Sequence, residues 1–198
     1  ATTVCTDCGP PTDFAANPDR ILFERIRGGG SLMMLEPDSG TAVEMVPVSR
    51  EGQYVFAGRF SPDARWIAFH ALVERTSPKR VFVAPVRNGR GLGQAHWLPA
   101  TDVDAEEADA TWSPRASMLY FLSGRDGFRC VWARKFDSAR AAFKGDAVPV
   151  MHFHSARRSL TMLGERNGMA GLTLTPDRLI IALGELTGNI WLARPARP

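Results

Sequence analysis

The chain alternates short apolar runs with polar turns that contain proline or glycine, a pattern that predicts strands rather than helices. Four segments contain a proline, a polar turn and then an apolar run: "NPDRILFERI" at Pro18, "SPDARWIAFHA" at Pro62, "SPRASMLYFLS" at Pro114 and "TPDRLIIALGE" at Pro176. Proline fixes φ for the turn, and the polar residues that follow it complete the tip. Each segment is therefore predicted to form a strand, a turn and a second strand.

A further strand is predicted after each copy, because another apolar run follows a polar or glycine-rich turn. These runs are "RGGGSLMMLEP", "TSPKRVFVAPV", "SGRDGFRCVWARKF" and "ELTGNIWLARP". Asp126-Gly127 and the residues 187–189 are of the types that tolerate positive φ in hairpin turns.

Large apolar residues stand two positions before three of the prolines, namely Phe60, Trp112 and Leu174. We expect them to pack between neighbouring sheets. In the first copy this position is Ala16, and we expect the nearby Phe14 to take its place.

The four copies recur at intervals close to or somewhat above the roughly 40 to 50 residues of one four-stranded propeller blade. This repeat predicts an all-β fold, a β-propeller of about four four-stranded blades, in which each blade buries its faces against its neighbours. The blades are expected at about 14–52, 53–106, 107–160 and 161–198, within a single domain over 1–198. They form either a small closed ring, with residues 1–6 as the closing strand, or part of a larger propeller. Self-association of open arcs is a third alternative.

The segments "FSPDARWIAF", "WSPRASMLYFLSGRDGFRCVW" and "LTPDRLIIALGELTGNIWLAR" resemble the WD-like Pro-Asp repeat of TolB-type β-propellers, which are bacterial proteins. That repeat runs W-S-P-D-G, an apolar strand, S-x-R-D-G and an I-W strand. The resemblance covers most of the chain from about Phe14 onward. The chain departs from it at Arg115, which replaces the aspartate, and at all four turns, where the glycine after it is missing. The resemblance implies a binding scaffold, often one part of a longer chain, and identifies no ligand.

The composition, with 44% hydrophobic and 23% charged residues in a chain of 198, is typical of a soluble globular protein. A net charge of +3 is small, and its arginines and lysines are scattered, which argues against nucleic acid as a partner. No apolar run approaches the roughly 20 residues that a membrane helix needs. The chain begins at Ala1 without a leader, so we expect that a targeting segment was removed or that the chain is a piece of a longer protein. Periplasmic and cytoplasmic localisation therefore both stay open.

Candidate binding residues lie in "VMHFHSARRSL". His152 and His154 are two apart, so on a strand both imidazoles project to the same side, with Arg157 and Arg158 nearby. The pair can face one ion or one anionic ligand. The sequence places no third ligand, and a metal site normally needs at least three. We therefore predict contact of these four residues with a ligand or partner, with no metal and no cofactor; a structural role of the histidines is the alternative.

The remaining reactive residues carry weaker signals. Cys5 and Cys8 form a C-x-x-C that is compatible with two plain turn residues, a disulfide or a metal site, although structural zinc needs four ligands. Cys130 is expected to be a small buried hydrophobe. The acidic stretch 101–112 is predicted to be a solvated loop between blades rather than a calcium site, and Asp126 is predicted to cap the amides of its turn.

Enzyme motifs are missing from the sequence: it has no G-x-S-x-G elbow, P-loop or dinucleotide fingerprint. The leading prediction is a non-catalytic scaffold that binds a protein partner or a small ligand on a propeller face or in the channel. The alternative is a metal-dependent or carboxylate-based hydrolase or lyase, with its residues spread over several blades.

Overall fold

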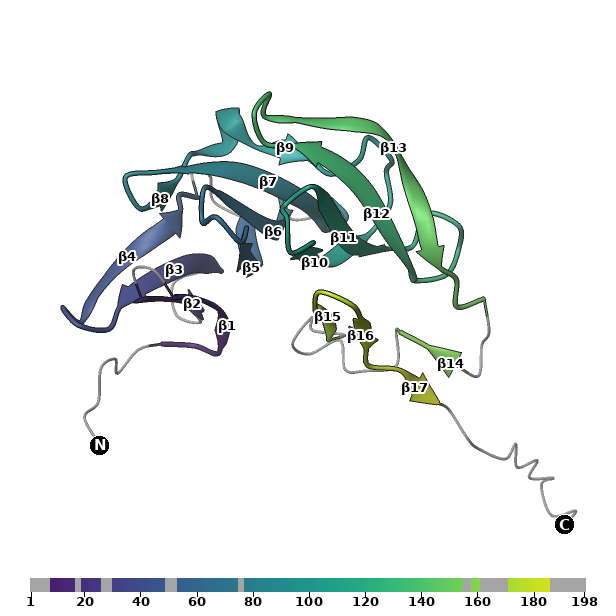
Figure 1. Ribbon diagram of the computed structural model, residues 1–198, viewed down its shortest axis with the longest axis horizontal. Helices are drawn as coiled ribbons and strands as arrows, with labels where there is room; N and C mark the ends of the chain where they lie inside the picture. The colour runs from purple at the N-terminus through teal and green to yellow at the C-terminus, as the bar shows by residue number, and fades with distance from the viewer. Residues whose placement is uncertain are drawn as a thin grey trace, which may run out of the picture.

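The computed structural model describes residues 8–16, 19–25, 30–48, 53–74, 77–154, 158–160 and 171–185. Their regular structure is almost entirely antiparallel β-sheet, as predicted, and the sheets follow one another along an arc (Figure 1). None of the helical structure in these ranges is long and apolar enough to cross a membrane. The fold is that of an all-β propeller.

Two of the sheets have four strands in sequence order. The first sheet contains β1 (Pro11–Ala16), β2 (Asp19–Arg25), β3 (Ser31–Glu36) and β4 (Thr41–Val46). The third sheet contains β10 (Glu107–Trp112), β11 (Met118–Ser123), β12 (Cys130–Asp137) and β13 (Ala142–Met151). Each is a meander of the kind that forms one propeller blade.

The second sheet has five strands, and the fourth copy is made of short strands. The second sheet contains β5 (Tyr54–Phe60), β6 (Trp66–Leu72) and β7 (Arg80–Arg87), with β8 (Arg90–Gly91) and β9 (Leu98–Pro99) both paired to β7 around the short 3-10 helix η1 (Gln94–His96). In the fourth copy, β15 (Leu172–Leu174) pairs with β16 (Leu179–Ile181), and β14 (Arg158–Ser159) pairs with β17 (Gly184–Glu185).

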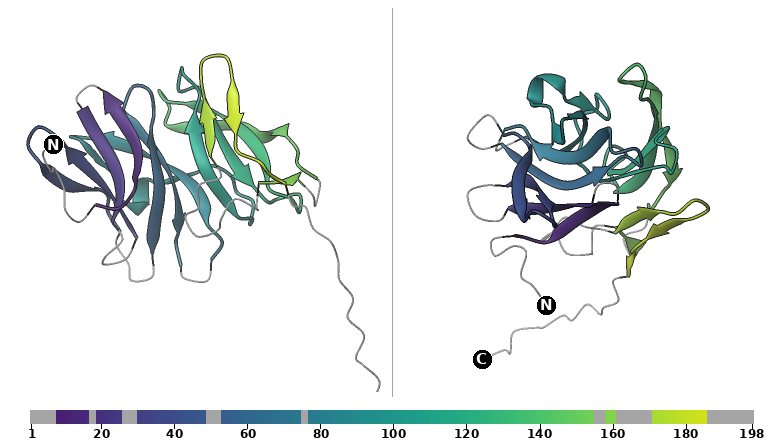
Figure 2. Two further views of the ribbon diagram at one scale, coloured as in Figure 1. Left: turned by 90° about the horizontal axis from the view of Figure 1, so that it is seen from below. Right: turned by 60° about the vertical axis from the view of Figure 1, so that its left-hand side comes forward.

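The first strands of successive sheets, β1, β5, β10 and β15, lie next to one another. The chain thus runs outward from the inner strand of each sheet, and Figure 2 shows the sheets fanned side by side. Within the described ranges, no strand of the first sheet pairs with β14–β17. The predicted closing strand, residues 1–6, lies outside the described residues.

The proline turns of the second and third sheets repeat the same hydrogen bond across five residues, and the fourth copy makes a related bond in a turn that is two residues shorter. A hydroxyl just before the proline accepts a hydrogen bond at 3.0 Å from a backbone amide ahead of it in the turn (Ser61 from Trp66, Ser113 from Met118, Thr175 from Arg178). Ala64 and Ala116 adopt φ of 54° and 52°, the left-handed region that favours glycine. These are the positions at which the TolB-type repeat carries glycine.

The core lies between the sheets, as expected for blades. Phe60 is buried between the first and second sheets, and Trp112 between the second and third, where its Nε1 donates to the Arg59 carbonyl at 3.2 Å. The prediction for Phe14 was wrong, because its side chain is 55% exposed. Neighbouring residues of a strand face opposite ways, and Ala15 takes the side that packs on the core.

The prediction of a solvated acidic loop holds for part of its range only. Asp102, Asp104 and Glu106 are exposed, whereas Glu107 and Asp109 are buried because β10 begins at Glu107. The carboxylate of Glu107 accepts hydrogen bonds from the Val81 amide of the second sheet and from the Thr101 hydroxyl. This acidic side chain therefore helps to join two sheets.

Candidate functional site

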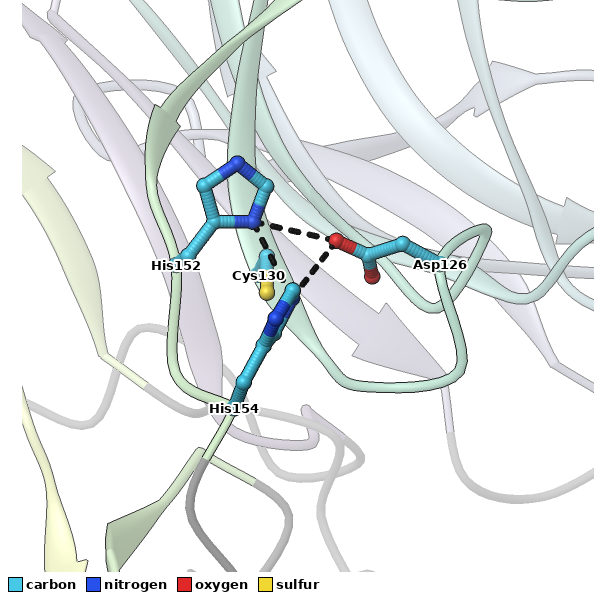
Figure 3. Close-up of side chains that lie close together, drawn as sticks. All are labelled: Asp126, Cys130, His152 and His154. Carbon is cyan, nitrogen blue, oxygen red and sulfur yellow. Dashed lines mark hydrogen bonds and ion pairs between the residues drawn. The ribbon is translucent and has the colours of Figure 1, made fainter.

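The two predicted histidines lie at the end of the third sheet, where the chain leaves β13, and they converge on one carboxylate (Figure 3). His152 Nδ1 is 3.1 Å from His154 Nε2. Oδ2 of Asp126 lies 3.0 Å from the first nitrogen and 2.8 Å from the second. All three side chains are partly exposed, at 44%, 46% and 23% for His152, His154 and Asp126.

Strand register explains why these residues meet. In the antiparallel pair of β12 and β13, Val131 stands opposite Met151, so Cys130 and His152 are neighbours across the two strands. The backbone amide of Phe153 donates to the Sγ of Cys130 at 3.3 Å. The hairpin turn between β11 and β12 then carries Asp126 back over this end of the sheet.

Asp126 has the turn role that its sequence predicted and a second role that the sequence did not reveal. Its Oδ1 accepts a hydrogen bond from the Phe128 amide at 3.4 Å, in a turn where Gly127 takes φ of 86°. The other oxygen, Oδ2, is turned to the histidines. Partial burial raises the pKa of Asp126, but the hydrogen bonds from His154 and the Phe128 amide outweigh it and lower the pKa overall. Asp126 is thus a carboxylate at neutral pH.

Cys130 completes the group. Cys130 is fully buried, as predicted. It also lies beside the other three side chains, and the four potential ligand atoms are all within 4.8 Å of one another. Burial raises the pKa of the Cys130 thiol, and the negative charge of Asp126 acts in the same direction, while the Phe153 amide opposes both. The sulfur is therefore a thiol at neutral pH unless a cation replaces its proton.

Aromatic rings hold the two imidazoles from the outside. The ring of Phe128 stacks on His154 with centroids 4.9 Å apart, and Trp132 meets His152 edge to face at 5.8 Å. The guanidinium of Arg125 lies 4.4 Å from the centroid of a ring of the same Trp132. These contacts restrict the orientations of the histidine rings.

Of the two predicted arginines, only the backbone of Arg158 is described. Arg157 lies outside the described residues. Arg158 belongs to β14, where its backbone pairs with that of Glu185.

The remaining reactive residues have structural surroundings. His70 is buried in β6 against Phe56, and burial lowers its pKa to about 3. His96 is exposed on η1. Cys8 is disulfide-bonded, which favours the disulfide alternative for the C-x-x-C, while Cys5 lies outside the described residues.

Two surface cavities of about 520 and 500 Å³ are lined by neither His152 nor His154. The first is lined by residues of the second and third sheets that include Arg65, Arg87 and His96, with no carboxylate. The second contains one carboxylate, that of Asp63. Neither of these two cavities presents the carboxylate pair that a carboxylate-based hydrolase needs.

The arrangement of sheets is similar to that of two solved TolB structures. A putative TolB from Agrobacterium tumefaciens shares 17% sequence identity with a TM-score of 0.55, over 73% of this chain and 50% of that one. TolB from Acinetobacter baumannii shares 14% identity with a TM-score of 0.54, over 74% of this chain and 33% of that one. No protein-family model and no curated protein matches the sequence.

These similarities confirm the fold as that of TolB-type β-propellers. The described chain spans half the length of the first TolB structure and a third of the second.

Proposed function

We propose that the chain is a non-catalytic propeller module that binds a partner protein at the end of its third sheet. The observation that supports this most is the distribution of exposed apolar side chains. Eight large hydrophobic residues are exposed in the described ranges, and four of them are on the β11–β12 turn or on β13 (Phe128, Val148, Val150 and Met151). Clustered exposed apolar side chains with polar groups beside them are typical of protein interaction sites.

The residues around this patch suit recognition by side chains rather than by strand addition. β13 is the outer strand of its sheet, but Pro149 has no N–H to donate and Lys144 places a charge on the strand, features that protect an edge from further pairing. Trp132, whose ring meets His152, is of a residue type that contributes most binding energy at interfaces. A partner would therefore contact the aromatic and imidazole rings together with the exposed valines.

A protein partner fits this surface better than a small ligand. Small-molecule sites are concave and enclose most of their ligand. The histidine group lies outside both cavities described above, and its histidines are nearly half exposed. An open surface of this kind suits a broad contact.

The second candidate is a metal-dependent hydrolase, which the group of four potential ligands favours. Catalytic zinc sites, however, use three protein ligands and keep the fourth position for water. Asp126, Cys130, His152 and His154 would fill all four positions of a tetrahedral ion. The donor set therefore favours a closed site, and a binding role ranks above hydrolysis.

Site-specific photocrosslinking in the native cell tests the proposal. A photoreactive residue at Val150 should capture one specific protein that the same residue at Phe14 does not capture, because Phe14 is at least as exposed as Val150 but lies on the first sheet. Binding of that purified partner should then weaken about tenfold or more in Val150→Asp, the effect of losing about 1.4 kcal/mol at an interface. The proposal fails if both positions capture the same proteins, or if Val150→Asp binds as tightly as the wild type.

A further inference from the structure

We propose that Asp126, Cys130, His152 and His154 bind a divalent transition-metal ion of the zinc type. This site goes beyond the proposed partner binding and does not depend on it. The four donor atoms converge within 4.8 Å, and they come from a turn, a strand start and the segment after β13.

Protonation of the group supports a shared cation at its centre. His152 Nδ1, His154 Nε2 and Asp126 Oδ2 form a triangle with sides of 2.8, 3.0 and 3.1 Å. Each ring nitrogen offers one in-plane direction, for a proton or for a lone pair. If both nitrogens donate to Oδ2, the two N–H groups converge on one oxygen, and the 3.1 Å between the nitrogens is then not a hydrogen bond. If one nitrogen donates to the other, that donor cannot also point at the carboxylate. Hydrogen bonds therefore cannot satisfy all three sides, whereas a cation accepts all three lone pairs.

The spacing of the donors is close to that of a tetrahedral site. Nitrogen and oxygen ligands at about 2.0–2.1 Å from zinc lie about 3.3–3.4 Å from one another. The observed triangle is only slightly smaller, so an ion would spread it by a few tenths of an ångström. A thiolate at about 2.3 Å would lie about 3.5 Å from these ligands. Since the four atoms lie within 4.8 Å of one another, the sulfur of Cys130 has to approach by up to about 1.3 Å.

The chemistry of the donors selects the class of metal. Two imidazoles, one thiolate and one carboxylate suit zinc and its neighbours, because calcium and magnesium prefer oxygen ligands throughout. Both oxygen and sulfur ligands already have supporting hydrogen bonds, from the Phe128 amide to Asp126 Oδ1 and from the Phe153 amide to Cys130 Sγ. Such outer contacts orient ligands in metal sites.

The first experiment is titration of the full purified chain with Co²⁺, followed by displacement with Zn²⁺. A four-ligand site with one thiolate should bind one Co²⁺ per chain and give visible tetrahedral absorption with a thiolate-to-cobalt charge-transfer band. Cys8 is disulfide-bonded, so the band should vanish in Cys130→Ser. Native mass spectrometry should count one zinc ion per chain after displacement.

Variants at exposed ligands keep the test independent of folding. His154→Ala changes a side chain that is 46% exposed and should lower the affinity for Co²⁺ by at least about 100-fold, since even loss of an outer-shell contact costs about 10–100-fold. The matched control is His96→Ala, an exposed histidine on η1, which should bind Co²⁺ as the wild type does. Unfolding midpoints without metal should agree among all three proteins.

The proposal is overturned if the wild type gives no charge-transfer band. It is equally overturned if His154→Ala and His96→Ala bind Co²⁺ with the same affinity. Crosslinking from Val150 reports on the partner alone, so failure of the metal site and failure of the proposed function are told apart.

Discussion

Replacing Glu107 tests whether one buried carboxylate holds the second and third sheets together. Glu107 begins β10 and is completely buried. Its Oε2 accepts from the Val81 amide of β7 at 3.1 Å, and its Oε1 accepts from the Thr101 hydroxyl. The guanidinium of Arg125, whose side chain is 13% exposed, lies 3.3 Å from Oε1.

The expected loss follows from what each substitution leaves behind. Glu107→Ala leaves a buried guanidinium and a buried amide without this partner; breaking a buried ion pair from one side costs about 3–5 kcal/mol. Glu107→Gln keeps the volume and one acceptor oxygen but turns an amide NH₂ toward the Val81 N–H. Its loss in free energy of unfolding should be smaller, about 1–3 kcal/mol, as for a buried polar group left unsatisfied.

The pH dependence of the stability difference between wild type and Glu107→Gln is a second expectation, and its direction follows from the pKa of Glu107. Burial raises the pKa of Glu107 above its ordinary 4.5, and the hydrogen bonds from Thr101 and Val81 and the charge of Arg125 oppose this only in part. The native state therefore holds the proton more tightly than the unfolded chain does. The stability that this side chain contributes is full below pH 4.5 and falls as the pH rises through the raised pKa. The difference between wild type and Glu107→Gln should shrink toward neutral pH.

Urea unfolding of the two variants and the wild type between about pH 4 and pH 8 measures both effects. The control is Glu106→Gln, because Glu106 is 45% exposed and its ion pairs with Lys79 and Arg129 are of the surface type, worth about 0–1 kcal/mol. The reasoning is refuted if Glu107→Ala costs no more than Glu106→Gln. It is also refuted if the difference between wild type and Glu107→Gln grows with pH.

Three further substitutions probe the turns and the core. Ala64→Gly should stabilise the fold by about 0.5–1 kcal/mol, because glycine adopts the left-handed φ of 54° without strain. This gain exceeds the loss that comes from a more flexible unfolded chain, and an unchanged or lower thermal midpoint would contradict it. Asp137→Asn should destabilise at neutral pH, because Lys144 and then Arg140 lower the pKa of Asp137. The difference from the wild type should be constant above the ordinary pKa of 3.8 and should narrow steadily as the pH falls below it; a difference that stays the same down to about pH 2 would contradict this. Phe69→Ala should cost about 3–5 kcal/mol in urea unfolding, while Phe14→Ala should stay within about 0.5 kcal/mol.

The fold was predictable because its signals are local. A proline turn needs a hydroxyl residue just before the proline. Ser61 and Ser113 both accept from the amide five residues ahead, and Thr175 accepts from the amide three residues ahead in a shorter turn. Alternation then decides which side of a strand is buried, and Phe60 and Trp112 follow it. Alternation predicts burial only if it is known which residue of the strand faces the core. In the first copy the expected position, Ala16, has no bulky side chain, and the expectation moved to Phe14, which faces outward.

Half of the candidate site was predictable for a similar reason. His152 and His154 meet because residues two apart share a side, which the sequence shows directly. Asp126 and Cys130 join them only through the pairing of β12 with β13, whose register shifts between Val131 and Trp132. A bulge of this kind changes which residues stand side by side and has no residue-type signature. The one available signal was that Asp126 and Cys130 belong to the hairpin that precedes the histidine strand.

The acidic stretch shows how backbone geometry shared by repeats can decide burial against composition. β5 and β10 carry a bulge at the same place, between Phe56 and Arg59 in one and between Ala108 and Thr111 in the other. The residue just inside each bulge has positive φ, 47° at Ala57 and 49° at Asp109, and both are buried. The position with positive φ is alanine in β5 and aspartate in β10. The charged composition of the stretch therefore predicts that Asp109 is exposed, whereas comparison with the equivalent Ala57 predicts that it is buried. Because the copies align through their proline turns, the burial of a charged residue in one blade is better judged from its counterpart in the next blade than from its neighbours in sequence.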